Sequence, residues 1–157
     1  MILAAIAIPN LLSARLAAQE ASGSETVHAV QVASFNYLAQ YQNGFPASMS
    51  VLGGTPGAAP TCGASNAIDD TLATSGQKGL YAISYYVGTT TATPAPGCTA
   101  AASSTNFAVT AIPTSGAGTN GIVSYCSDEK GLFSDGGAGG MTASQTDAAC
   151  EGFTPLQ

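Results

Sequence analysis

The sequence predicts an α+β protein in which a long N-terminal α-helix packs on an antiparallel β-sheet of three to four strands. Two observations lead to this fold class. The first forty or so residues are rich in helix formers and carry apolar side chains at helical spacing, whereas short aromatic and β-branched runs follow only after residue 79. The chain has 157 residues, which is room for one domain of ordinary size.

The predicted helix extends to about Gln42. Residues 11–20 are dominated by the strong helix formers Ala, Leu, Gln and Glu. From residue 27 onward an apolar stripe follows at helical spacing, widened by Phe35 and Leu38; its members are Val27, Val30, Ser34, Tyr37 and Tyr41. The pair Asn43–Gly44 is expected to end the helix, and Pro46 to stop it from resuming.

Two positions are expected to weaken this helix. Pro9 removes a backbone donor and should kink or loosen the turn before it, and Gly23 is a second soft spot. A helix of about forty residues would be about 60 Å long at 1.5 Å per residue. That length exceeds the width of the domain to which it belongs, so we expect one end to protrude.

The strand predictions follow a loop-rich segment, residues 45–79. Short helical turns are expected there at residues 48–52 and around residues 67–72, with Asn66 as a cap. Four runs then indicate strands: residues 80–87, 106–112, 121–126 and 131–134, the last two joined by a polar hairpin connection at residues 127–130. The apolar face of this sheet needs a cover, and the stripe of the long helix is the obvious candidate.

The charge balance excludes several classes of function. The formal net charge is −6, only 8% of the residues are charged, and the cations are Arg15, Lys78 and Lys130. No basic patch for nucleic acid and no polybasic lipid anchor can be built from these three. His28 is the only histidine and has no Ser or Cys motif around it, so we expect a surface or interface histidine and no enzyme.

The four cysteines, Cys62, Cys98, Cys126 and Cys150, form no CxxC pair, so a zinc site is disfavoured. Disulfides are favoured over free buried thiols and place the chain in the periplasm or outside the cell. Three connectivities exist for four cysteines. We favour Cys62–Cys98 and Cys126–Cys150, because each then closes a glycine-rich loop, and the crossed pairings stay open.

The first twelve residues have Asn10 as their only polar side chain. They lack the basic leader of a signal peptide, and they are shorter than the roughly 20 apolar residues that span a bilayer. This segment is interpreted as the end of a longer apolar helix. The alternative is a buried helix of a compact soluble domain.

The run ILAAIAIPNLL at residues 2–12, followed by SARLAAQEAS at residues 13–22, closely resembles the type IV pilins and the major pseudopilins of type II secretion. Residues 41–54 (YQNGFPASMSVLGG) are similar to the exit of that family's helix into its connecting loop. The segment between Cys126 and Cys150 is similar to the disulfide-bounded C-terminal loop of many pilins. The family's opening segment, with its processing site, methylated first residue and glutamate, is absent from this sequence. From this resemblance we expect the native precursor to be inserted into the inner membrane.

The resemblance and the sequence pattern together predict two parts, residues 1–22 as a protruding apolar helix half that forms a filament core and residues 23–157 as a globular head. Burying six of the leading aliphatic side chains at about 1.5–3 kcal/mol each would drive assembly by roughly 10 kcal/mol or more, before ordering costs. One interpretation of Pro9 is that it lets the helix stretch and bend during packing. The alternative is an ordinary kink in the helix of a monomer. The residues expected at the assembly interface are Ile2, Leu3, Ile6, Ile8, Pro9, Leu11, Leu12, Arg15 and Leu16.

Charged side chains give two further hypotheses. Glu20 and Glu25 are candidates for pairing between subunits, and Arg15 is expected to find a carboxylate on a neighbouring subunit, with a solvated surface arginine as the equal alternative. Asp128, Asp135 and Asp147 are weak calcium candidates, since major pseudopilins often carry a calcium site near this end of the sheet. Solvated turn carboxylates are the favoured interpretation, and no other cofactor is expected.

The expected function is that of a structural subunit of an extracellular filament on the cell surface, a homopolymer whose heads serve adhesion, motility or DNA capture. The Thr/Pro-rich residues 89–97 are either an O-glycosylated segment or a plain flexible loop. One alternative is a major pseudopilin that drives protein secretion, and another is a secreted binding domain anchored by one helix.

Overall fold

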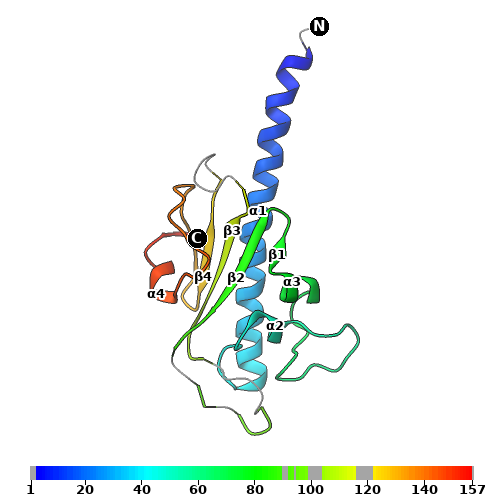
Figure 1. Ribbon diagram of the computed structural model, residues 1–157, viewed down its shortest axis with the longest axis vertical. Coiled ribbons are helices and arrows are strands. Elements are labelled where there is room, and N and C mark those ends of the chain that lie inside the picture. Colours follow the sequence, from blue (N-terminus) through cyan, green and yellow to red (C-terminus); the bar gives the residue numbers. More distant parts are fainter. Residues whose placement is uncertain (1–2, 90–91, 94, 99–103, 116–121, 157) are drawn as a thin grey trace.

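A computed structural model describes residues 3–89, 92–93, 95–98, 104–115 and 122–156, and for residues 3–12 the backbone alone. Helix α1 (Leu3–Tyr41) runs along the sheet, and its N-terminal part extends beyond it (Figure 1). The helix is uninterrupted at Pro9 and at Gly23, so neither position ends it. It ends one residue earlier than expected, because Gln42 adopts the left-handed conformation with φ 48°.

The sheet has six antiparallel strands in the order of the chain: β1 (Gln77–Lys78), β2 (Tyr81–Val87), β3 (Phe107–Pro113), β4 (Tyr125–Asp128), β5 (Leu132–Ser134) and β6 (Thr154–Leu156). The α+β class is confirmed, but the expected three to four strands are wrong. Strands β2 to β5 correspond to the four predicted runs. The two missed strands are the edges, which are two and three exposed residues long, and Pro155 in β6 is tolerated because an edge strand needs fewer backbone donors.

The β4–β5 connection is shorter than predicted, because Ser127 and Asp128 belong to β4. A carboxylate oxygen of Asp128 accepts hydrogen bonds from the backbone N–H groups of Lys130 (2.7 Å) and Gly131 (3.0 Å). These two bonds close the turn over residues 129–131. The hairpin therefore begins two residues later than the polar sequence 127–130 indicates.

Three short helices complete the fold. Helix α2 (Met49–Leu52) lies where a helical turn is predicted, whereas α3 (Asp70–Ser75) begins after the predicted cap Asn66. The cap is Asp69, whose side chain accepts from the backbone N–H groups of Thr71 and Leu72. Helix α4 (Asp147–Cys150), in the C-terminal segment, is not predicted from the sequence.

Both faces of the sheet are covered. On one face, a buried stripe of α1 packs on β3 and β4; its buried members are Val27, Val30, Ala33, Ser34 and Tyr37. On the other face, the C-terminal segment with α4 forms a smaller core, which consists of Ala108, Cys126, Phe133, Met141 and Cys150 with Tyr86, Ile112 and Phe153 (Figure 1). The helix stripe is thus one of two covers, where the sequence predicted a single one.

Candidate assembly surface

The N-terminal part of α1 leaves the sheet, and its first described side chains are exposed. Residues 13–18 are all exposed, including Leu16 at 36%. Of the side chains predicted for assembly, only those of Arg15 and Leu16 are described, and the structure places both at this surface. The others, Ile2, Leu3, Ile6, Ile8, Pro9, Leu11 and Leu12, lie outside the described side chains. Among the described residues, no helix is both long enough and apolar enough to span a membrane.

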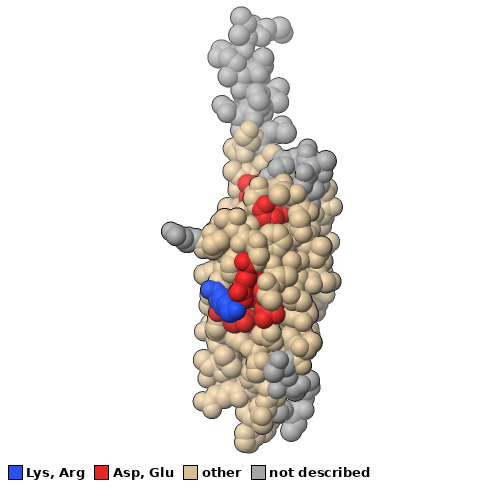
Figure 2. Space-filling view, turned by 90° about the vertical axis from the view of Figure 1, so that its left-hand side faces the viewer, with Lys and Arg blue, Asp and Glu red and all other residues tan. Residues whose placement is uncertain are grey.

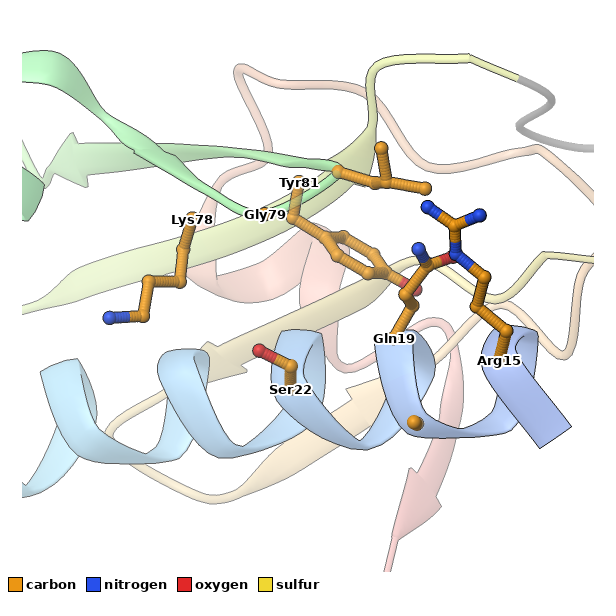
Figure 3. A pocket seen from close by; sticks show the side chains of 8 residues that line it. Arg15, Gln19, Ser22, Lys78, Gly79 and Tyr81 are labelled. Carbon is orange, nitrogen blue, oxygen red and sulfur yellow. The ribbon is translucent and has the colours of Figure 1, made fainter.

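A cavity of about 420 Å³ opens between this part of α1 and the β1–β2 connection. Figure 3 shows Arg15 and Gln19 rising from α1 toward β2, with the Tyr81 ring beside them and Lys78 at the other end of the cavity. The cavity is lined by Arg15, Ala18, Gln19 and Ser22 of α1, which follow the spacing i, i+3, i+4 and i+7 and so share one helix flank.

A second cavity of about 320 Å³ continues along the same flank of α1. It is lined by Glu25, Thr26 and Ala29 of the helix and by residues 67–69 and Leu72 before and within α3. Ser22 and Lys78 line both cavities, so the two form one groove, which we call the α1 groove. The groove carries Arg15 at one end, Lys78 in its middle, and Glu25 and Asp69 at the other end.

Two of the three cations of the chain therefore lie in the α1 groove. Among the described residues, neither Arg15 nor Lys78 belongs to an ion pair. The single ion pair in the described part of the chain joins Lys130 to Glu151, outside the groove. Glu20, considered above as a partner for a neighbouring subunit, is used within its own chain, where its carboxylate accepts a hydrogen bond from the backbone N–H of Val123 at 3.3 Å. Glu25 is exposed.

Acidic side chains gather on the face that carries α4, around one lysine (Figure 2). Among the three calcium candidates, Asp128 and Asp135 are buried, so the expectation of solvated turn carboxylates is wrong for both. Their oxygens are bonded by backbone donors: Asp135 accepts from the N–H groups of Ser124, Gly137 and Gly139. Asp147 accepts instead from the Asn106 side chain at 2.9 Å. Within the described part of the chain, no three His, Cys, Asp or Glu side chains lie close enough together to hold a metal ion.

Two buried carboxylate oxygens in this acidic region, one each on Asp128 and Glu129, have no hydrogen-bond partner among the described residues. Burial raises the pKa of Asp128, although the N–H groups of Lys130 and Gly131 oppose the shift. Burial likewise raises the pKa of Glu129, and the negative charges of Asp128 and Asp147 act in the same direction. Both carboxyl groups therefore hold their protons more tightly in the folded chain than in water.

The side chain of His28 is exposed on α1, as expected for a surface histidine. Its imidazole is therefore open to solvent. A general base needs a substrate proton within about 3 Å of a positioned nitrogen.

The cysteines lie in the pairs that we favoured, Cys62 with Cys98 and Cys126 with Cys150. Their Cα–Cα distances of 5.7 and 5.6 Å suit disulfides. The first disulfide is tied to the end of α1, because the Tyr37 hydroxyl donates a 2.8 Å hydrogen bond to the Cys62 carbonyl. The second joins β4 to α4, and both of its cysteines are fully buried.

The comparisons with known proteins give no relative: no protein-family model, no curated protein and no solved structure matches the chain.

Proposed function

We propose that this chain is a structural subunit of an extracellular filament of the type IV pilus kind, without enzymatic activity of its own. The observation that carries the proposal is the course of α1, which continues past the sheet that covers its C-terminal half. The sequence of the extending part is almost wholly apolar up to Leu12, and the first described side chains beyond the sheet include an exposed leucine.

Such a helix is most stable when other copies cover it. Burying apolar surface contributes about 25 cal/mol per Å², and among the described residues the hydrophobic core that the head forms with α1 begins at Val27. A chain with 8% charged residues and two disulfides suits a closely packed assembly outside the cell. We place the subunit on the cell surface, with its precursor in the inner membrane and other copies of itself as its partners; its charge offers nothing to nucleic acid.

The test is to express the gene in its source cells with its own upstream sequence, shear the cell surface and examine the sheared fraction by electron microscopy with an antibody to the head. Labelled filaments are expected. A chain that stays a monodisperse monomer under these conditions contradicts the proposal and favours a helix-anchored binding domain. Short filaments that stay in the periplasm and bind calcium would indicate a major pseudopilin.

A variant pair sharpens this test. Leu16→Asp should abolish or strongly reduce filament yield, because a charge would be buried between subunits. Leu156→Asp is the matched control, since Leu156 in β6 is equally exposed at 39% but lies on the C-terminal edge strand. Both variants should fold as well as the parent chain, and equal filament yields from the two would contradict the placement of the interface on α1.

A further inference from the structure

The end of the head from which α1 emerges carries two of the chain's three cations beside two exposed leucines. Arg15 and Leu16 are neighbours on α1, and Lys78 and Leu80 flank Gly79 in the β1–β2 connection. This connection reaches the level at which α1 leaves the sheet (Figure 1). Arg15, Lys78 and Leu80 line one cavity. We call these two cations and two leucines the base of the head.

The positive charge at the base of the head has no ion-pair partner within the part of the chain that the structure describes. Glu20, which follows Arg15 on α1, accepts a backbone hydrogen bond from the segment before β4. Asp69, which shares the second cavity with Lys78, accepts two backbone hydrogen bonds at the start of α3. Glu25 is ten residues beyond Arg15, about 15 Å further from the apolar run along the helix axis. Both charged groups of the base are therefore positive and exposed.

The place of the base along α1 matches the headgroup layer of a bilayer that holds the apolar run. This run ends at Leu12, and Arg15 is three residues further, about 5 Å along the helix axis. The headgroup layer on each side of the hydrocarbon core is about 5–8 Å thick. A bilayer that contains residues up to Leu12 would therefore hold Arg15 at the level of the lipid phosphates. The apolar stem of Lys78 would extend its ammonium group toward the same layer.

We propose that the base of the head binds the phosphate groups of anionic phospholipids while the subunit is still in the inner membrane. Arg15 and Lys78 then hold the head on the membrane surface, and Leu16 and Leu80 rest against the acyl boundary. This inference rests on the proposed function, because the apolar helix supplies the anchoring that two cations alone would not. Each cation near an anionic surface strengthens binding about fivefold, so the two predict a preference of roughly twenty-fold for anionic over zwitterionic lipid. The preference should weaken as the salt concentration rises.

The test uses the precursor with its own upstream sequence, purified from source membranes and reconstituted into nanodiscs. One set contains phosphatidylcholine alone and the other an equal mixture of phosphatidylcholine and phosphatidylglycerol. Hydrogen–deuterium exchange of residues 77–80, read by mass spectrometry, should be several-fold slower in the mixture, and high salt should remove the difference. The peptide that carries α4 should exchange at one rate in both lipids and in every variant, which shows that the head is folded.

Charge removal identifies the residues that recognise the lipid. Arg15→Gln and Lys78→Gln should each reduce the difference between the two lipids several-fold. The matched control is Lys130→Gln, which removes the third cation, the one paired with Glu151, and should leave the difference unchanged. Equal exchange of residues 77–80 in the two lipids, or an equal reduction in Lys130→Gln, would overturn the inference.

Free phosphate separates a lipid site from a site for soluble anions. Inorganic phosphate added to the phosphatidylcholine nanodiscs should not slow the exchange of residues 77–80, and the same slowing as in the lipid mixture would overturn the inference. All of these contrary results leave the filament in place, because its formation is observed separately by electron microscopy. A precursor that inserts into neither bilayer and forms no filament would instead contradict the proposed function and, with it, the inference.

Discussion

The ring of Tyr81 lies directly against Gly23 of α1. A Cβ built on Gly23 would fall 2.7 Å from two carbons of the ring, a distance that real Cβ atoms do not tolerate. The Tyr81 hydroxyl donates a 2.9 Å hydrogen bond to the Val123 carbonyl, which holds the ring in place. The glycine in the middle of α1 is therefore a contact point between the helix and β2, and the helix continues through it.

Gly23→Ala is expected to destabilise the chain, although alanine favours helices by about 1 kcal/mol over glycine. Overpacking against a fixed ring costs about 1–3 kcal/mol, so the net loss should reach up to about 2 kcal/mol. Urea denaturation of both chains measures it. Ser24→Ala, at the neighbouring and partly buried position, is the control and should not lower the midpoint. A Gly23→Ala chain as stable as the parent would contradict the packing argument.

Asn43 links the end of α1 to the loop that precedes Cys98. Its side chain is fully buried, donates to the Tyr37 hydroxyl at 3.3 Å and accepts from the Ala95 N–H at 3.0 Å. Asn43→Ala should lower the free energy of unfolding by about 1–3 kcal/mol, because the backbone N–H of Ala95 loses the Asn43 side-chain oxygen that accepts its hydrogen bond. Thermal or urea denaturation would show this loss. The control is Asn36→Ala, at an exposed position of α1, which should change stability little. Equal losses of stability in the two variants would contradict the role of Asn43 as a link between α1 and this loop.

The acidic region predicts a pH dependence of stability. The pKa of Asp128 is raised above its ordinary value of 3.8, so the folded chain binds this proton more tightly than the unfolded chain. Its contribution to stability is therefore fully present below pH 3.8 and is lost as the pH rises through the raised pKa.

Asp128→Asn tests this sign, because the amide oxygen can keep the bonds from Lys130 and Gly131 without the charge. Relative to the parent, the variant should gain stability as the pH rises from 3 to 7. Urea denaturation across this range would measure the difference. If the stability of the variant relative to the parent stays constant, or falls as the pH rises, burial does not disfavour the charged form of Asp128.

The two disulfides should differ in their rates of reduction. Cys126 and Cys150 are fully buried, whereas Cys62 is partly exposed. Since an attacking thiolate must reach a sulfur, mild reductant should open Cys62–Cys98 first. Alkylation and mass spectrometry at graded reductant concentrations would show which cysteines are labelled. Initial labelling of Cys126 and Cys150 would contradict the burial argument.

Most of the α1 stripe and the four central strands could be predicted from the sequence, because each is a periodic or continuous apolar run that carries its own signal. Phe35 is the exception in the stripe: it is 38% exposed and touches the core through edge contacts with Phe45 and Phe107. Strands β1 and β6 gave no such signal, because two or three exposed residues at a sheet edge have no apolar pattern. The cap of α3 was misplaced because both Asn66 and Asp69 are residue types that cap helices.

The candidate site could be predicted only in part. Arg15 and Leu16 stand out in the sequence because they follow an apolar run and Arg15 is the first cation of the chain. Lys78 does not, since 63 positions separate it from Arg15 in the sequence. Only the packing of the β1–β2 connection against α1 brings the two cations to one groove and leaves Glu25 and Asp69 at its other end.

The sequence alone determined that the chain has a long leading helix, a β-rich second half and few charges, because helix propensity, apolar spacing and composition are local properties. The tertiary structure decided which polar groups remain free. It assigns Glu20 to the Val123 N–H and buries Asp128 at the end of β4 and Asp135 after β5. Within the described part of the chain, it leaves Arg15 and Glu25 outside any ion pair on one helix flank. The reason is physical: a side chain's partners are set by segments distant along the chain, and only folding brings those segments within hydrogen-bonding range.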